Sequence, residues 1–378
     1  MNVLHISNYF DPHIGGIEQT AKDVMNVLKK LENIKQELIC FNTLNKNVVD
    51  NIDGNKIIRC STFAKIASQS ISLSFNKILQ KEIKLFKPDV IIFHFPNPLQ
   101  STALMKQLAK HKNIKLIVYY HLDITKQKIL GKLFEKQTFK LLERAKTIIA
   151  TSPNYVDGSK FLKKFKNKCA IIPSMIDIER LKLTEEEKLK AIKINKKYEN
   201  KKIIFFIGRH VEYKGLEYLI EADKYLNQNN TQIIIAGNGK LTNVLKNKAS
   251  NIKNIEFIGK ISDSDYRCYL KAAYIFAFPS ITKNEAFGLS LAEAMYLYKP
   301  SVTFKIDGSG VNYLNLNNVT GFEAKNQDSK DYADKINLLL NDSSLYKRFS
   351  SNSHNRIENL CMKEQFEFNI KEAIEKVK

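Results

Sequence analysis

Short apolar runs that alternate with helix-like segments constrain the fold of this 378-residue chain more than any other feature. Buried strands separated by helices form parallel sheets that helices cover on both faces. At about 150 residues per domain, the length accommodates two such units. We therefore expect an α/β chain with two Rossmann-like domains. The expected strands cover residues 3–6, 37–41, 90–93, 116–120 and 147–150 in the first half, and 203–207, 232–236, 255–258, 274–278 and 300–303 in the second.

A change in composition marks the expected domain boundary. Pro173-Ser174-Met175 gives way to a polar, lysine-rich stretch that ends near Lys202, where the next apolar run begins. We expect residues 1–175 to form the first domain and residues 176–361 to form the second.

The overall composition is that of an ordinary soluble chain, with 26% charged and 44% hydrophobic residues. No apolar stretch is long enough to cross a bilayer, and the first residues read as a strand instead of a signal peptide. The five cysteines show no Cys-x-x-Cys spacing, which argues against a zinc site or a disulfide framework. These features predict a cytoplasmic protein.

The formal net charge of +21 is unevenly distributed. Residues 1–170 contain 28 Lys and Arg against 13 Asp and Glu, whereas the remainder contains 32 against 26. Residues 76–87, 126–146 and 159–168 mix lysines with apolar residues at helical spacing, as a basic surface on anionic lipid would. A lysine-rich genome with solvated lysines explains the same composition. Nucleic acid is not indicated, because no recognised binding module is present.

Two glutamates, Glu285 and Glu293, bracket the segment that is most informative about function. It follows the apolar run 274–278 and Pro279-Ser280, and it leads into a helix-favouring sequence. Ligands bind at such strand-to-helix junctions in parallel sheets, because the first amides of the helix lack an intrahelical partner and favour anions.

This segment resembles the Glu-x7-Glu signature of retaining GT-B glycosyltransferases, the large bacterial family known as glycosyltransferase family 4 or glycosyl transferases group 1. The resemblance implies a GT-B fold of two Rossmann-like domains facing a central cleft, with a last helix, about residues 362–378, that returns to the first domain. It implies that Glu285 binds hydroxyls of the donor sugar and that Glu293 binds those of the ribose. Backbone amides near Phe287, Gly288 and Leu289 would add donors to the diphosphate.

A second motif, Gly208-Arg209 followed by Lys214-Gly215, also stands between an apolar run and a helix. It looks like the element of the family whose Arg and Lys hold the diphosphate of a sugar nucleotide. Negative charge grows on the leaving diphosphate as the sugar–phosphate bond breaks, and two fixed cations stabilise it. Arg209 and Lys214 would therefore replace a metal ion, and we predict neither a metal nor a cofactor.

The first domain supplies two further candidates after its strands. Gly15 and Gly16 precede a helix, and the family has such a loop against the donor phosphates; the pattern is not the Gly-x-Gly-x-x-Gly of NAD enzymes. His121, which ends the run 116–120, matches the active-site histidine of the family, which lies near the transferred sugar. His94 ends another strand and is a weaker candidate on the acceptor side.

Three other motifs in the second half carry less weight. Asp263-Ser264-Asp265 imitates a metal-binding Asp-x-Asp, but Ser262 with Asp265 is typical of a helix cap. Ile258 lies in a stretch whose backbone meets the nucleotide base in the family. Asn312 stands where relatives carry an acid, a departure from the family pattern.

The resemblance implies a hexosyltransferase that takes a sugar from a UDP- or GDP-sugar and retains its configuration. The acceptor would be a hydroxyl of a glycan, or of a polyprenyl-linked or other lipid-linked molecule. The product would belong to a cell-surface polysaccharide such as lipopolysaccharide or capsule, or to a glycolipid, made at the inner face of the membrane. Two alternatives stay open at this point: a GT-B sugar-nucleotide epimerase and a non-enzymatic basic surface binder.

Overall fold

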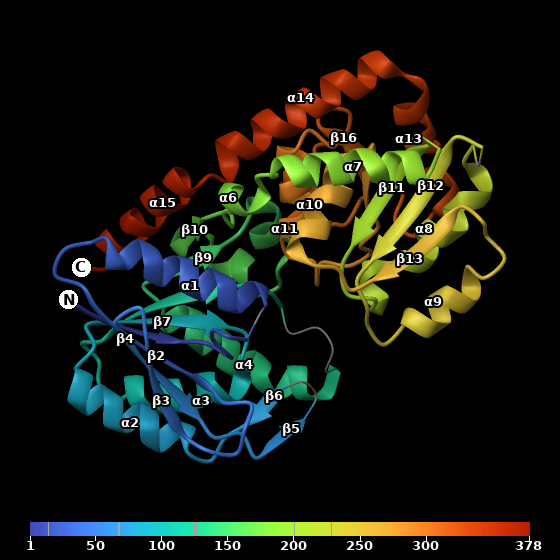
Figure 1. Cartoon of the computed structure of the whole chain (residues 1–378). Coiled ribbons are helices and arrows are strands. Elements are labelled where there is room, and N and C mark those ends of the chain that lie inside the picture. Colours follow the sequence, from blue (N-terminus) through green and yellow to red (C-terminus); the bar gives the residue numbers. More distant parts are fainter. Residues whose placement is uncertain (14, 67–68, 124–127, 200, 228) are drawn as a thin grey trace. The chain divides into compact units, whose positions relative to one another are not determined.

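The chain forms two compact units in the computed structural model (Figure 1). Unit 1 consists of Met1–Ile172 and Phe366–Lys378, and unit 2 of Pro173–Gln365. The structure describes residues 1–13, 15–66, 69–123, 128–199, 201–227 and 229–378.

A sheet of eight strands in the described residues forms the centre of unit 1, in the order β10-β9-β8-β7-β1-β2-β4-β3. All neighbours pair in parallel except β3 and β4. The strands are β1 (Asn2–Ile6), β2 (Lys35–Phe41), β3 (Val48–Ile52), β4 (Asn55–Cys60), β7 (Val90–Phe95), β8 (Lys115–Tyr120), β9 (Thr147–Ala150) and β10 (Cys169–Ile171), and a separate hairpin joins β5 (Ala64–Ile66) to β6 (Gln69–Ile71).

The helices of unit 1 follow local sequence signals. The buried residues Phe75, Leu79 and Ile83 recur every four positions in α2, so one face of that helix packs inward. Asn97 caps α3, because its side chain accepts a hydrogen bond from the Gln100 amide at 2.9 Å. These helices are α1 (Gly16–Lys29), α2 (Phe75–Phe86), α3 (Pro98–Leu108), α4 (Lys128–Arg144), α5 (Pro153–Gly158), the 3₁₀ helix η1 (Leu162–Lys168) and, for most of its length, α15 (Lys363–Glu375).

Two features of unit 1 differ from the sequence expectations. Strand β3 is antiparallel, because Asp53 and Gly54 adopt positive φ and close a tight hairpin to β4. The segment 159–168 does not form an amphipathic α-helix: only its residues 162–168 are helical, as the 3₁₀ helix η1, with non-helical backbone at Phe165. Residues 126 and 127 of the predicted basic segment 126–146 lie outside the described residues.

Unit 2 contains a fully parallel sheet in the order β13-β12-β11-β14-β15-β16. The chain passes outward from β11 through β12 to β13 and then crosses to the other side of β11 for β14, so the direction of winding reverses between β11 and β14. The strands are β11 (Lys202–Ile207), β12 (Thr231–Ala236), β13 (Ile255–Gly259), β14 (Ile275–Phe278), β15 (Ser301–Phe304) and β16 (Gly321–Ala324).

Helices connect these strands. The side chain of Thr184 and that of Glu187 form a reciprocal capping box at the start of α7. The helices are α6 (Ile178–Leu181), α7 (Glu185–Lys197), η2 (Glu212–Lys214), α8 (Leu216–Ala222), η3 (Asp223–Tyr225), α9 (Thr242–Lys248), α10 (Asp263–Ala272), α11 (Leu289–Tyr296), α12 (Val311–Leu314), α13 (Ser329–Asn341) and α14 (Ser343–Leu360). Within the described parts of the chain, no helix is both long and apolar enough to cross a lipid bilayer.

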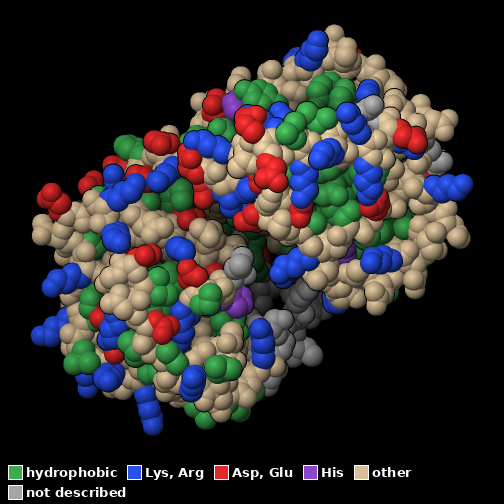
Figure 2. All heavy atoms as spheres, viewed as in Figure 1, with side chains coloured by type: hydrophobic (Ala, Val, Ile, Leu, Met, Phe, Trp, Pro, Cys, Tyr) green, Lys and Arg blue, Asp and Glu red, His purple; other side chains and the backbone are tan. Residues whose placement is uncertain are grey.

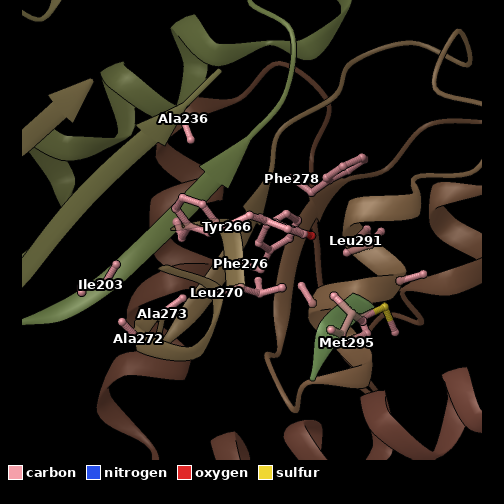
Figure 3. Packing of buried hydrophobic residues seen from close by; sticks show 14 of the residues in the cluster. Ile203, Ala236, Tyr266, Leu270, Ala272, Ala273, Phe276, Phe278, Leu291 and Met295 are labelled. Atoms are coloured by element: carbon pink, nitrogen blue, oxygen red, sulfur yellow. The ribbon is translucent and has the colours of Figure 1, made fainter. Parts of the chain in front are cut away.

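Apolar side chains fill the space between the unit 2 sheet and the helices on each face. Figure 3 shows one of these layers, in which Phe276 and Phe278 from β14 lie among Leu270 of α10 and Leu291 of α11. On the other side, the hydroxyl of Tyr332 donates to Val302 O at 2.6 Å and accepts from Phe278 N at 2.9 Å. The Tyr332 hydroxyl therefore bridges the last residue of β14 and Val302 of β15.

The ten runs predicted as strands all coincide with observed strands, which confirms the α/β architecture with parallel sheets in two units. The strands without a prediction are short or alternate with polar residues: β3, β4, β5, β6, β10 and β16.

Candidate functional site

An ion pair joins two predicted motifs at the reversal point of the unit 2 sheet. Lys214, after β11, donates from Nζ to Oε2 of Glu285, after β14, although 71 positions separate them. Their side chains are only 10% and 14% exposed. Ligands of open α/β sheets bind beyond the carboxyl ends of the strands at such a reversal.

The two predicted cations of unit 2 have different surroundings. Nζ of Lys214 lies 4.8 Å from the centroid of the Phe278 ring, so an aromatic face adds to its ion pair with Glu285. Arg209 is exposed and donates from Nη2 to the hydroxyl of Tyr213 at 3.0 Å. The other guanidinium nitrogens of Arg209 have no partner among the residues that the structure describes, so they are available to an anion.

Close backbone approaches hold the loops of this region together. A Cβ at Gly215 would lie 2.2 Å from Pro279 O, and Gly215 also has a φ of +60°. A Cβ at Gly310 would lie 2.1 Å from Ala286 O. The loops after β11 and β15 therefore each contact the loop after β14, and both contacts depend on glycine.

The start of α11 offers uncapped amides beside Glu285. Gly288, at φ +99°, precedes the helix, and no side chain caps it. The amides at the first positions of a helix have no intrahelical acceptor and attract anions. Phe287, Gly288 and Leu289, which were predicted to contribute amides, thus lie at an open helix start.

Glu293 has a different environment from Glu285. It is 7% exposed, and its two oxygens accept from Nη2 of Arg180 and from the hydroxyl of Tyr266, the latter at 2.5 Å. Burial and the adjacent carboxylate raise the pKa of Tyr266 well above its usual value. The sequence did not single out Arg180 or Tyr266; an arginine and a tyrosine far apart in the chain gave no local signal. A ribose bound here would share Glu293 with both.

Ile258, the predicted contact of the nucleotide base, is the extra residue of a β-bulge. Phe257 pairs with Ile235 and Gly259 pairs with Ala236, so Ile258 has no partner residue in the β12–β13 ladder. The pairing of β13 with β12 is thus irregular at Ile258.

The remaining motifs of unit 2 have structural partners. Ser262 accepts from the Asp265 amide at 3.0 Å and caps α10, as predicted. Asp265 also pairs with Lys190 at 2.6 Å. Asn312 donates to Glu323 Oε1 at 2.7 Å and to Phe304 O at 3.0 Å, so it ties its loop to β15 and β16.

Unit 1 has its own reversal point, between β1 and β7, where polar side chains join the ends of the two strands. Asn97 donates to Asn8 Oδ1 at 2.7 Å, and Gln100 donates to Ser7 O at 3.0 Å. Gly15 is the extended residue before α1, and a Cβ at Gly16 would meet no atom within 4 Å. Gly16 therefore leaves open space at the start of that helix.

His121 belongs to a buried row of stacked rings in unit 1. Its Nε2 lies 3.1 Å from Nδ1 of His94, and the two rings stack at 5.4 Å with an interplanar angle of 15°. Tyr119 stacks on His121 at 4.6 Å, and His5 stacks on His94 at 6.2 Å. Burial lowers the pKa of His121 to about 3 and, despite a hydrogen bond to Gln36, that of His5 to about 4. All three histidines are thus neutral near pH 7, because burial also lowers the pKa of His94.

Two family models match successive parts of the chain. The model described as Glycosyltransferase Family 4 matches residues 14–180, and the model described as Glycosyl transferases group 1 matches residues 187–356. The chain is 28% identical to the O-antigen chain mannosyltransferase C of Escherichia coli, over 95% of this chain and 94% of that protein. It is 28% identical to the D-rhamnosyltransferase WbpZ of Pseudomonas aeruginosa, over 85% and 82% of the two chains.

Solved structures share the fold. Sucrose-phosphate synthase from Thermosynechococcus elongatus superposes with a TM-score of 0.80 at 18% identity, over 99% of this chain and 98% of the other. HepE from Anabaena, in complex with UDP and glucose, superposes with a TM-score of 0.77 at 17% identity, over 99% of each chain. These likenesses confirm the predicted GT-B fold.

Replacing Gly215 with alanine tests the close contact between the loops. Alanine at φ +60° is strained, and its methyl would also displace Pro279. We expect G215A to lower the free energy of unfolding by roughly 3 kcal/mol. The matched control is G259A, which has a φ of +72° but no atom within 4 Å of the added Cβ and should cost about 1 kcal/mol. Urea unfolding of both variants measures the difference; equal losses would contradict the loop contact.

Because these histidines are buried in their neutral form, we expect acid to destabilise unit 1. In the folded state the pKa is about 4 for His5 and about 3 for His121, and burial also lowers the pKa of His94, against about 6.5 for a histidine in the unfolded chain. The unfolded state therefore binds more protons below about pH 6.5, and the free energy of unfolding falls as the pH decreases.

The His5→Phe variant isolates one of these histidines. Between pH 7.5 and pH 5.0, the wild type should lose on the order of 1–2 kcal/mol more than H5F, because the variant lacks one group that must be kept neutral. Urea unfolding at both pH values measures the two losses. Identical losses in the two proteins would refute the assignment of His5 as a neutral buried group.

Proposed function

The chain belongs to glycosyltransferase family 4, and from this membership we propose that it transfers a sugar from a nucleotide-diphosphate donor to a hydroxyl acceptor, with retention of configuration. It is a glycosyltransferase of polysaccharide synthesis, like the O-antigen mannosyltransferase that it resembles along almost its full length. The sugar-nucleotide epimerase and the non-enzymatic binder are not favoured, because the named relatives are transferases.

The Lys214–Glu285 ion pair carries the proposal. In the ligand-free protein each group neutralises the other in a nearly buried position. A sugar diphosphate offers both groups new partners: an anion for Lys214 and sugar hydroxyls for Glu285. Binding thus exchanges one charge-assisted contact for two.

The leaving diphosphate defines the roles of the neighbouring groups. Lys214, Arg209 and the amides at the start of α11 would stabilise the charge that develops on it, so the protein itself supplies the positive charge of the site. Glu293 would bind the ribose together with Arg180, and the backbone of Ile258 would meet the base.

In unit 1, His121 would contact the transferred sugar, and the start of α1 at Gly15 and Gly16, which is open at Gly16, would face a phosphate. The donor would be a UDP-sugar, as in the HepE complexes, or a GDP-sugar. The acceptor would be a glycan or a lipid-linked glycan.

The Lys214→Met variant tests the diphosphate site. We expect UDP- or GDP-sugars to raise the melting temperature of the wild type in a thermal-shift screen, since a ligand that binds only the folded state stabilises it. With the identified donor, K214M should lose about 10²- to 10³-fold in kcat/KM, as expected when a group that stabilises developing charge is removed.

The control for K214M is K240M. Lys240 is an exposed lysine that pairs with Glu212 in the same region of unit 2, with both side chains 59% exposed. K240M should retain the wild-type kcat/KM within about twofold, because exposed ion pairs contribute little. Equal activity of K214M and the wild type would refute the proposed role of the ion pair.

A surface of lysines and phenylalanines on unit 1 supports a peripheral contact with anionic lipid at the inner face of the membrane. The Phe139 ring lies 5.0 Å from Phe161 and 6.4 Å from Phe165, and Nζ of Lys164 lies 4.6 Å from its centroid. The lysines of this surface are Lys136, Lys140, Lys160, Lys163, Lys164, Lys166 and Lys168. Two of these lysines pair with acids, Lys160 with Glu135 at 2.6 Å and Lys166 with Asp157. Basic and acidic side chains are also interspersed over the face drawn in Figure 2.

Vesicle sedimentation tests the membrane contact. The double variant K163E/K164E should reduce binding to vesicles of phosphatidylcholine with phosphatidylglycerol at least about tenfold, since each lysine near such a surface contributes about 1 kcal/mol. The control K246E/K253E makes the same charge change at exposed positions of unit 2 and should leave binding unchanged. Equal losses in the two variants would attribute the binding to net charge alone.

A further inference from the structure

We propose that His94 is a positioning residue that selects the tautomer of His121: His94 donates from Nδ1 to Nε2 of His121, which therefore carries its own proton on Nδ1. His121 then presents a hydrogen-bond donor to its ligand and not a proton acceptor. The assignment of the tautomer depends on the described contacts of unit 1 alone, whereas its catalytic meaning rests on the proposed function.

The geometry restricts the pair to two arrangements. The distance of 3.1 Å between His94 Nδ1 and His121 Nε2 is that of a hydrogen bond, so one nitrogen carries a proton and the other a lone pair. Tyr119 stacks on both imidazoles, at 5.5 Å from His94 and 4.6 Å from His121, and His5 stacks on His94 at 6.2 Å, so the pair lies within a packed row of rings.

The second nitrogen of His94 distinguishes the two arrangements. Nε2 of His94 is fully buried and has no hydrogen-bond partner among the described residues. If Nε2 held the proton, a buried N–H would be left unpaired, which proteins avoid more strictly than an unpaired lone pair. The proton of neutral His94 therefore resides on Nδ1, and it points to His121.

His5 provides an independent example of the same rule in the same row. Gln36 donates from Nε2 to Met25 O at 3.0 Å, which orients its amide, so its Oε1 accepts from Nε2 of His5, also at 3.0 Å. The proton of His5 is thereby assigned to Nε2. The other nitrogen, Nδ1, is buried without a partner and holds the lone pair. In both histidines, the nitrogen without a partner is the unprotonated one.

The position of the proton on His94 determines which nitrogen of His121 can bind a ligand. No hydrogen bond involves Nδ1 of His121 among the described groups, and His121 is 8% exposed, whereas His94 is fully buried. The lone pair on Nε2 of His121 accepts the hydrogen bond from His94, so the N–H at Nδ1 of His121 remains available. His121 would then donate to an oxygen of the transferred sugar, and it would not accept a proton from the acceptor hydroxyl, since a general base needs a free lone pair.

Nitrogen NMR of the full-length protein tests the tautomer directly. Long-range ¹H–¹⁵N spectra of ¹⁵N-histidine-labelled protein distinguish protonated from unprotonated ring nitrogens, and the H121N variant identifies the signals of His121 by their loss. At pH 7.5 and without any substrate, we expect Nδ1 of His121 to be protonated and Nε2 to be unprotonated. The opposite pattern in the wild type would overturn the proposal.

Two substitutions of His94 connect the tautomer to activity. H94N offers an amide donor near the position of Nδ1 and should keep the wild-type pattern at His121 and kcat within about threefold. H94F retains an aromatic ring but lacks the donor; it should lose the single tautomer and about tenfold or more in kcat, with little change in KM. An unchanged tautomer and kcat in H94F would overturn the proposal.

H5F is the matched control, because His5 is buried in the same row but has no hydrogen bond to His121. It should leave the tautomer of His121 unchanged. The NMR result tests the tautomer assignment even if the protein transfers sugar from none of the tested donors. A failure of sugar transfer would refute the proposed function and leave the tautomer assignment intact.

Discussion

The candidate site of unit 2 depends on the ion pair between Lys214 and Glu285. The pair joins the loops after two neighbouring parallel strands at the reversal point of the sheet. Bringing two charges out of water is costly unless each is well paired, so a nearly buried pair at this point requires precise loop positions. Gly215 and Gly310 provide them, because side chains there would separate the loops. In the proposed function, the same pair offers a cation and a carboxylate to a sugar diphosphate.

Glu285 and Glu293 belong to one short motif but have different structural roles. Glu285 connects the loops at the strand ends, whereas Glu293 connects helix α11 to Arg180 of α6 and to Tyr266 of α10. In unit 1, a comparable connection is made by neutral groups. The row of His5, His94, Tyr119 and His121 lies across three strands, and hydrogen bonds and stacking orient its rings. At the candidate residues, unit 2 thus uses ion pairs, whereas unit 1 uses hydrogen bonds and stacking between neutral rings.

The sequence predicted the strands because each long apolar run must be buried on both faces in a parallel sheet. It missed β3, whose residues alternate between exposed and half-buried positions, and it therefore missed the one antiparallel pairing of the large sheets within the described residues. It identified Lys214 and Glu285 by motif, but not their contact, and it did not identify Arg180, Tyr266 or the role of His94. These partners lie 27 or more positions away from the groups they contact, and no local pattern connects them.

The sequence by itself determined the alternation of strands and helices, the glycines at strongly bent positions and the identity of the charged groups after the strands, since each is a property of a local stretch of chain. Only the tertiary structure decided which of these groups meet. The order of strands in a sheet brings residues 71 positions apart into an ion pair, and the burial of three histidines in one row decides their protonation. Pairing and burial are relations between distant segments, and they exist only after the chain has folded.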